Sequence, residues 1–415
     1  MAAVGKARIL FASIVGTALE FYDFMLYAVF AGTIGHVFFP TDGTNDFSAG
    51  WLTFAIAFVA RPFGASVFGH IGDKFGRKRA LVLTVSLMGI PTFIIGVLPG
   101  FDTIGYWAPV ILITCRLLQG LCTGGEYNGS AIFTLEHVGK NYPGMSGAFV
   151  TGASVIGALG ANGAAYIVTA DGMPDWAWRG TFLFGALISL FGLYIRLYIA
   201  ESPAFEKLKK EKKVIRSPLT DALFRHKNAV FLTITIGFLN GTLSYTLYKF
   251  VNMYLNEMFS FSYHQTFGYT NIGIITFIFM APLWGFVLDK IGGKTLLLGS
   301  SLLAMMVAFP LFGLLQHTDS SVLILSQVLL GITVASIAGP EHAFVQRLFP
   351  IKDRYSGVAF SFSLGIGLGA GFSPILMKYL MESTTNLYAP GIVIFSVGFL
   401  CFITLFRYKG PFYDL

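Results

Sequence analysis

Acidic side chains interrupt an apolar segment near the start of this sequence. Glu20 and Asp23 lie between Thr17 and Tyr27, at spacings that place them near one face of a helix. A further acid, Glu126, lies in another apolar segment. Ionisable residues at membrane depth are costly and commonly belong to proton pathways. These three acids are therefore the candidates for proton coupling, with helix packing as the alternative for the first two.

Basic and polar side chains form a second set of candidates. Arg116, Gln119 and Glu126 share one stripe of a helix. Arginine stays charged and can bind a carboxylate through two parallel hydrogen bonds, so Arg116 and Arg61 are candidates for binding an acidic substrate group. A fixed ion pair is the alternative for each, and an acid of the first apolar segment is the expected partner of Arg61. The other candidate substrate contacts are Tyr22, Tyr127, Tyr245, Lys249 and Asn252.

Composition indicates what must position these side chains. Of 415 residues, 55% are hydrophobic and 12% are charged, whereas about 25% are charged in an average soluble domain. This excludes a soluble enzyme, a disordered chain and a secreted disulfide scaffold, and leaves a protein that crosses a membrane several times. The cysteines (Cys115, Cys122 and Cys401) have no metal-ligand spacing. We expect no metal site and no cofactor.

Twelve apolar segments are long enough to span a bilayer, which takes about 20 residues. Six precede residue 201 and six follow residue 227. We predict an all-α membrane protein with an N-terminal six-helix bundle (1–200), a cytoplasmic basic linker (201–227) and a C-terminal six-helix bundle (228–415). The predicted spans are 10–38, 50–70, 80–99, 107–134, 144–169, 180–200, 229–257, 266–288, 295–316, 321–347, 356–381 and 388–407.

The basic residues set the orientation of these spans. Four of them lie at 74–79, between spans two and three, whereas the loops at 40–46 and 316–320 contain neither lysine nor arginine. Since cytoplasmic loops are enriched in lysine and arginine, both termini and the linker are predicted to be cytoplasmic. The net charge of +7 then reflects topology and not a nucleic-acid partner.

The second half has its own polar positions. Lys249 is expected near mid-depth on a wide polar face of span seven. The alternative is that its side chain extends to the outer membrane–water interface. In span ten, Glu341 is expected at the cytoplasmic end, where an acid costs little, and His342 is expected to be structural. The polar face of span seven consists of Asn240, Ser244, Tyr245, Tyr248, Lys249, Asn252 and Asn256.

One loop pattern occurs twice. Residues 69–78 and 285–294 both contain a glycine, an Asp-Lys pair, a second glycine and a basic residue, half a chain apart. The repeat predicts two related halves, which is the architecture of many secondary transporters. We expect these loops to act as a conformational latch through Gly69, Asp73, Gly76, Arg77 and Asp289.

With these loops and with Arg116–Gly120 in span four, the sequence resembles the major facilitator superfamily. It is similar, more narrowly, to the metabolite:proton symporter branch. The resemblance implies two pseudo-symmetric six-helix bundles, the major facilitator fold, in a bacterial inner membrane. The segments that carry the finer resemblance are Ala18–Phe24, Arg61–Gly64, Gly124–Tyr127, Trp176–Arg179, Glu201–Pro203 and Leu348–Gly357.

The function that these features predict is proton-coupled symport of a small organic acid by alternating access. The alternatives are uptake of a zwitterionic osmolyte or amino acid of the proline or betaine type, and efflux of a drug or siderophore. A channel, a receptor or a membrane enzyme fits less well, because the sequence has no pore motif, no phosphate-binding loop and no catalytic constellation. The expected partners are a small-molecule substrate, protons and the lipid bilayer, and the expected state is a monomer.

Overall fold

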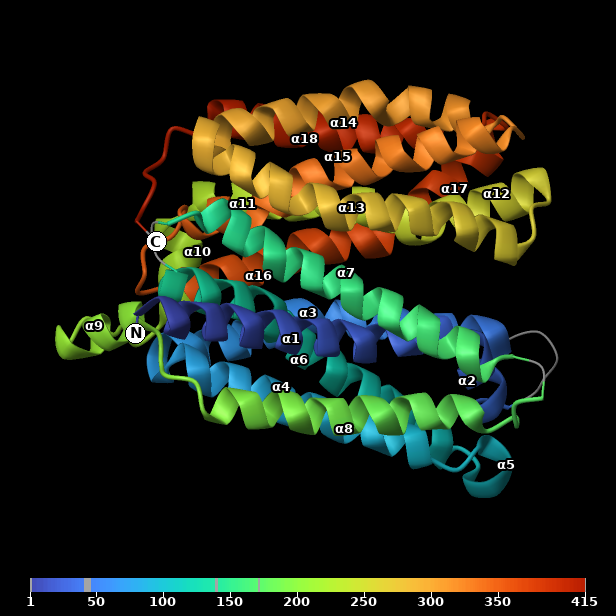
Figure 1. Ribbon diagram of the computed structural model, residues 1–415, viewed down its shortest axis with the longest axis horizontal. Coiled ribbons are helices and arrows are strands. Elements are labelled where there is room, and N and C mark those ends of the chain that lie inside the picture. Colours follow the sequence, from blue (N-terminus) through green and yellow to red (C-terminus); the bar gives the residue numbers. More distant parts are fainter. Residues whose placement is uncertain (1, 41–45, 139–140, 171, 415) are drawn as a thin grey trace. The chain divides into compact units, whose positions relative to one another are not determined.

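A computed structural model describes residues 2–40, 46–138, 141–170 and 172–414, and most of them are helical (Figure 1). The long helices of the first half are α1 (Ala2–Val29), α3 (Asp46–Phe75), α4 (Arg77–Val97), α6 (Trp107–Val138), α7 (Pro143–Val168) and α8 (Ala177–Leu197). Those of the second half are α11 (Lys227–Tyr245), α13 (Tyr263–Ile291), α14 (Gly293–Leu315), α15 (Ser320–Gln346), α16 (Arg354–Gly367) and α18 (Pro390–Arg407). Shorter elements are α2 (Ala31–Phe38), α5 (Phe101–Ile104), α9 (Pro203–Lys210), α10 (Pro218–Arg225), α12 (Val251–Phe259), α17 (Ser373–Thr384) and the π-helices η1 (Thr246–Phe250) and η2 (Leu368–Phe372).

The prediction of twelve membrane spans is confirmed. In the part of the chain that the structure describes, 11 helical segments are long and apolar enough to cross a membrane. The remaining span is a broken pair, Ser13–Val29 and Ala31–Phe38, whose axes differ by 62°. The first span is therefore not the single helix that the sequence suggested.

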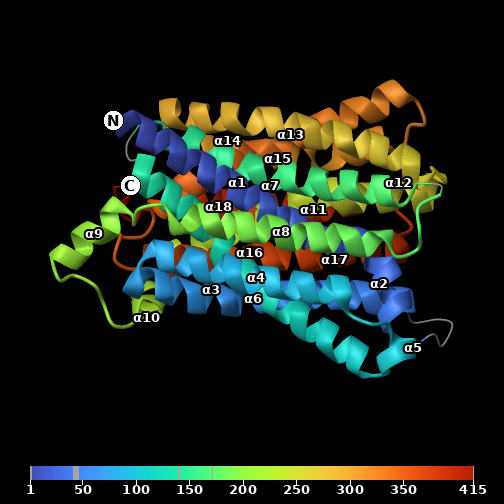
Figure 2. The same cartoon turned by 60° about the horizontal axis from the view of Figure 1, so that its bottom comes forward.

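The described helices form two compact units. The first consists of Met1–His137 and Ala153–Leu219, and the second of Val138–Gly152 and Thr220–Leu415. In the first unit, the N-terminus and α9 lie at one end and α2 and α5 at the other, as both views show (Figures 1 and 2). The spans of a unit therefore run from one end of it to the other, and each unit is described by itself below.

Two spans of the second unit contain a π-helical turn. Span seven runs through α11, η1 and α12, and span eleven runs through α16, η2 and α17. Short π-helical segments are rare and are frequently found at functional sites. In span eleven, Gly365 and Gly369 bring the chain against the backbone of α11 in the same unit.

Glycines bring α3 and α6 of the first unit into backbone contact. A Cβ atom on Gly124 would overlap the carbonyl oxygen of Arg61, and one on Gly120 would overlap that of Ala57. Close approach through small residues is a common way of packing membrane helices. The contact fixes Arg61 of α3 against the helix that carries the other arginine candidate, Arg116.

We expect Gly124→Ala to destabilise the protein by about 1–3 kcal/mol, because the added methyl group forces the two helices apart. Gly163→Ala is the matched control, since a Cβ there meets nothing within 4 Å. The control should be neutral or slightly stabilising, since alanine favours a helix over glycine by up to about 1 kcal/mol. Thermal melting of the two purified variants checks the pair, and equal melting temperatures would contradict the packing argument.

Candidate functional site

Five spans of the first unit bring ionisable side chains together in its interior. Glu20 and Asp23 come from α1, Arg61 from α3, and Arg116 and Glu126 from α6, and all five are buried. Helices α4 and α8 complete the cluster with threonines and one further arginine. The sequence prediction that these polar residues lie inside the helical bundle, and not toward lipid, agrees with their burial.

Asp23 and Arg116 are joined through two intermediate side chains, which we call the Asp23 group. Arg116 Nη1 donates to Gln119 Oε1 at 2.9 Å, and Gln119 Nε2 donates to Thr92 Oγ1 at 2.9 Å. The Thr92 hydroxyl in turn donates to Asp23 Oδ2. The guanidinium of Arg116 also lies over the ring of Tyr27, 4.0 Å from its centroid. The Asp23 carboxylate and the Arg116 guanidinium are thereby connected by side chains alone.

The other carboxylate oxygen of Asp23 is unused. Asp23 Oδ1 is buried and has no hydrogen-bond partner among the described residues. It faces α8, where a Cβ atom on Gly185 would lie 3.0 Å from it and 3.5 Å from the ring of Tyr22. The absence of a side chain at Gly185 leaves room beside this oxygen.

A second set of contacts, the Glu126 group, lies further along α6. Glu126 forms an ion pair with Arg196 of α8 and accepts a hydrogen bond from Thr84 of α4. Arg196 also donates to the carbonyl oxygen of Leu81 at 3.2 Å. Its guanidinium packs against Gly16 of α1, where any side chain would overlap it.

Glu20 interacts with members of both groups. Neither of its carboxyl oxygens has a hydrogen-bond partner in the described part of the chain, and its side chain is 5% exposed. Arg61 and Arg196 attract its carboxylate, and Glu126 and Asp23 repel it. An ionised carboxylate without hydrogen bonds is strongly unfavourable in a buried place, so Glu20 is the acid of the cluster with the least support for its charge.

The aromatic candidates of the first unit lie around this cluster. Arg61 stacks its guanidinium on Phe24 and Phe58, with centroid distances of 5.0 and 5.1 Å. The Tyr22 hydroxyl donates to the carbonyl oxygen of Thr181 in α8 at 3.4 Å. Tyr127 is buried, and its ring packs edge-on against Phe21 at 5.4 Å. Tyr22 is thus close to Asp23, and its hydroxyl is directed at the backbone of α8.

In the second unit, Asn240 and Asn252 of the predicted polar face of span seven bind two different neighbouring helices. Asn240 Nδ2 donates to Glu341 Oε2 of α15 at 2.7 Å, whereas Asn252 accepts from Thr270 of α13 at 2.7 Å. Lys249 is partly exposed within η1 between these two asparagines. A π-helical turn therefore lies between these two positions of the predicted face. That Lys249 and Asn252 face the substrate stays a prediction.

Burial contradicts the expectation that Glu341 costs little where it lies. Glu341 is fully buried and hydrogen-bonded to Asn240, although it lies in the last turns of α15. Asn240 in turn accepts a hydrogen bond from Ser244 at 2.8 Å. Tyr245 is buried and its ring lies 6.1 Å from that of Tyr248. Glu341 is thus a further buried acid, beside those expected in the first half of the sequence.

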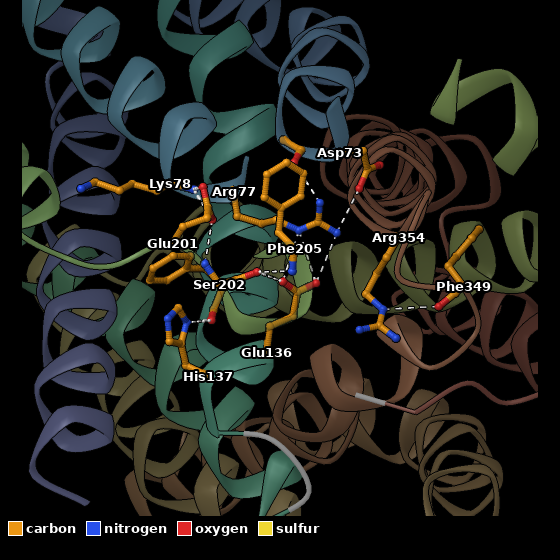
Figure 3. A network of polar contacts seen from close by, with 12 residues as sticks. Asp73, Arg77, Lys78, Glu136, His137, Glu201, Ser202, Phe205, Phe349 and Arg354 are labelled. Carbon is orange, nitrogen blue, oxygen red and sulfur yellow. Dashed lines mark hydrogen bonds and ion pairs between the residues drawn. The ribbon is translucent and has the colours of Figure 1, made fainter. Parts of the chain in front are cut away.

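The loop between α3 and α4 is the centre of a buried charge network (Figure 3). Arg77 pairs with Asp73 at 3.2 Å and with Glu136 at the end of α6 at 3.2 Å. Arg77 Nη1 also donates to the carbonyl oxygen of Gly72 at 2.9 Å. All three charged side chains are buried. The network ties three span ends of the first unit together, and Gly69 is buried in the last part of α3.

The segment after α8 closes this network. Ser202 donates to Glu136, and Glu201 accepts from the backbone N–H of Lys78 at 3.1 Å and from that of Ser202 at 2.8 Å. Gly76 has a φ of +119°, and a Cβ there would overlap the Glu201 carboxylate. This gives a structural reason for a glycine at the turn and for the acid and serine that follow span six.

The second copy of the loop makes a different contact within the second unit. Asp289 accepts from the backbone N–H groups of Gly144 at 2.7 Å and Met145 at 3.1 Å, in the first turn of α7. A carboxylate at this position satisfies two N–H groups that a helix leaves unpaired and interacts favourably with the helix dipole. The position of Arg77 in the first copy is occupied by Gly293, so no arginine competes for this carboxylate.

We expect Asp289→Ala to cost about 0.5–2 kcal/mol, the usual value for the loss of an N-terminal cap. The amides of the peptide 141–150 should exchange with solvent faster, which hydrogen-exchange mass spectrometry measures. Lys290→Ala removes a neighbouring exposed charge and is the control. Unchanged exchange in Asp289→Ala would show that the cap contributes nothing.

Comparison with known proteins identifies the family. The model of the Major Facilitator Superfamily matches residues 13–312 and residues 270–413. The chain belongs to this superfamily. It is 35% identical over 411 residues to the inner membrane metabolite transport protein YhjE of Escherichia coli (strain K12), covering 96% of this chain and 93% of that protein. It is 31% identical over 415 residues to the proline/betaine transporter of the same organism, covering 96% of this chain and 83% of that protein.

Among solved structures, the proton:xylose symporter XylE bound to 6-bromo-6-deoxy-D-glucose shares the fold, with a TM-score of 0.80 at 17% identity. That match covers 98% of this chain and 95% of the other. The predicted major facilitator fold and the metabolite:proton symporter branch are thereby confirmed. The protein is a transporter of this superfamily that crosses the membrane several times, and it is not an enzyme.

Proposed function

We propose that this symporter carries a small zwitterion, such as an amino acid or a betaine, together with a proton. The carrying observation is the Asp23 group, in which a buried carboxylate oxygen without a partner lies in one hydrogen-bonded chain with Arg116. The Asp23 carboxylate can bind the positive group of a zwitterion, and the Arg116 guanidinium can bind its carboxylate. The proline/betaine transporter among the relatives supports the same choice. The organic acid favoured by the sequence alone becomes the alternative outcome of the test.

Glu20 carries the proton in this proposal. With Glu20, Asp23 and Glu126 ionised, three carboxylates balance Arg61, Arg116 and Arg196, so the cluster is neutral. A proton on Glu20 leaves two carboxylates against three guanidinium groups, a net charge of +1. The extra positive charge leaves the arginines freer to bind the substrate carboxylate, while the still ionised Asp23 binds its cationic group, and this links proton binding to substrate binding.

The cycle is alternating access, with both termini and the linker in the cytoplasm. The two helical bundles, 1–200 and 228–415, move relative to one another. The loops around Asp73 and Asp289 are the proposed conformational latch, in which Asp73 pairs with Arg77 and Asp289 accepts from the backbone N–H of Gly144. Candidate contacts from the second bundle are Lys249, Tyr245 and Asn252, which stay predictions of the sequence analysis.

Uptake into proteoliposomes tests the proposal. Radiolabelled proline, glycine betaine and lactate are compared with and without an inward-directed proton gradient, after a thermal-shift screen of the same compounds on the purified protein. We expect a zwitterion to accumulate and lactate not to accumulate. Accumulation of lactate alone would indicate an organic acid as the substrate. Uptake of a zwitterion at a rate independent of the pH gradient would refute the proton step.

A further inference from the structure

A hollow of about 790 Å³ lies at one end of the first unit, outside the cluster described above. Its walls come from the end of α3, the start of α4, the end of α8, and α9. This is the end at which the N-terminus and α9 lie (Figure 2). Because basic residues gather here, the positive-inside rule assigns this end to the cytoplasmic face of the membrane.

The hollow is lined by more cations than anions. Lys74, Lys78, Arg79 and Lys209 line it together with Glu201 and Glu206, which leaves a net charge of +2. The Glu201 carboxylate is already occupied by backbone N–H groups of Lys78 and Ser202. The remaining charge therefore favours an anion.

One side of the hollow is apolar and belongs to membrane spans. Phe75, Leu83 and Leu197 line it with exposed fractions of 48%, 42% and 51%. They lie on α3, α4 and α8, near the ends of three spans that cross the bilayer. Exposed apolar side chains on a span face lipid chains, so the hollow opens to the hydrocarbon on one side and carries cations at the level of the headgroups.

Helix α9 is held in place by the buried network. Ser202 caps it by accepting from the backbone N–H of Phe205 at 3.1 Å, and Pro203 occupies its first turn. The buried Phe205 ring lies 5.2 Å from the Arg77 guanidinium (Figure 3). Lys209 is therefore presented to the hollow by a fixed helix and not by a free linker.

We propose that this hollow binds one anionic glycerophospholipid of the cytoplasmic leaflet. The headgroup phosphate lies among Lys74, Arg79 and Lys209, and an acyl chain runs along Leu83 and Leu197. Basic pockets between spans on the cytoplasmic side are suited to anionic headgroups. A soluble anion would use the cations and leave the apolar wall unused, so the combination of both walls points to a lipid. A bound lipid would join α3, α4, α8 and α9 at the end where the charge network lies.

Native mass spectrometry of the detergent-purified full chain tests the lipid site. We titrate phosphatidylglycerol and phosphatidylcholine of the same acyl composition, and expect retention of phosphatidylglycerol in preference. Lys74→Gln/Arg79→Gln/Lys209→Gln should weaken that retention at least about tenfold, since each basic residue near anionic lipid contributes about 1 kcal/mol. The matched control is Lys207→Gln/Lys210→Gln/Lys212→Gln, which removes three exposed lysines of the same segment that do not line the hollow.

Three results would overturn the proposal. The first is that the control variant loses as much phosphatidylglycerol retention as the triple variant. The second is that phosphatidylglycerol is not retained in preference to phosphatidylcholine. The third is that inorganic phosphate at millimolar concentration displaces the lipid completely. If the triple variant does not fold, Lys209→Gln alone, on the exposed α9, replaces it in the experiment. We then expect a smaller loss of phosphatidylglycerol retention. The readout is lipid retention and involves no transport, so failure here leaves the proposed substrate and proton step untouched.

Discussion

Replacement of Arg77 by leucine is expected to lower the melting temperature on the order of 10 °C. Arg77 is fully buried and pairs with Asp73 and Glu136, both also buried. Its removal leaves two carboxylates in the interior without their cation, and breaking a buried ion pair on one side costs about 3–5 kcal/mol. Arg77→Lys should recover part of the loss, because lysine keeps the charge and lacks the planar fork that reaches both acids.

A double variant separates the charge from the shape of this side chain. Arg77→Leu/Glu136→Gln removes one of the stranded carboxylates, so it should melt above Arg77→Leu although it carries one more substitution. Arg216→Leu makes the same change at an exposed linker position and should melt as the wild type does. Differential scanning fluorimetry of the four proteins measures this order. A double variant that melts below Arg77→Leu would show that the ion pairs do not account for the loss.

The membrane spans and most of the charge cluster could be predicted from the sequence, and for the same reason. Long apolar segments are unambiguous, and an ionisable residue within one must face the protein interior. This principle selected Glu20, Asp23, Arg116 and Glu126, all of which the structure buries in one cluster. The break at Phe30 in the first span was missed because both arms are apolar and neither a proline nor a charged residue lies at the break.

The partners of these residues could not be read from the sequence. Thr92 is an ordinary residue of a membrane helix, because a threonine hydroxyl there can bond to the carbonyl oxygen four residues back. The Met88 carbonyl oxygen lies 3.1 Å from the Thr92 hydroxyl as the alternative acceptor to Asp23. Arg196 lies one residue before the end of α8, where an arginine is usually an anchor at the membrane interface. Its inward position depends on the bare backbone at Gly16, far away in the sequence.

In the second unit, position along a span did not predict burial. Glu341 lies near the end of span ten by residue count, and its burial depends on Asn240 of a different helix. The π-helical turn of η1 has no composition that marks it, so the sequence did not predict it. Helical periodicity predicts a face only where the helix keeps its period.

Glu20→Gln is expected to abolish proton-driven accumulation and to leave substrate exchange intact. With one proton per substrate, a gradient of one pH unit supports about tenfold accumulation, because it corresponds to about 1.4 kcal/mol. Glutamine has the shape of glutamate and no proton to exchange, so accumulation should fall to about onefold, the equilibrium level. Counterflow across the same proteoliposomes, which needs no net proton movement, should continue at the wild-type rate.

Matched variants distinguish this role of Glu20 from a structural one. Glu257→Gln changes an exposed acid that pairs with Lys378 at 2.9 Å and should accumulate substrate as the wild type does. Asp23→Asn should raise the KM for exchange, since Asp23 is placed at the substrate. Glu126→Gln should destabilise the protein, because it leaves Arg196 buried without its partner. If Glu20→Gln still accumulates substrate tenfold while Asp23→Asn does not, the proton belongs to Asp23 and the division of roles within the cluster is reversed.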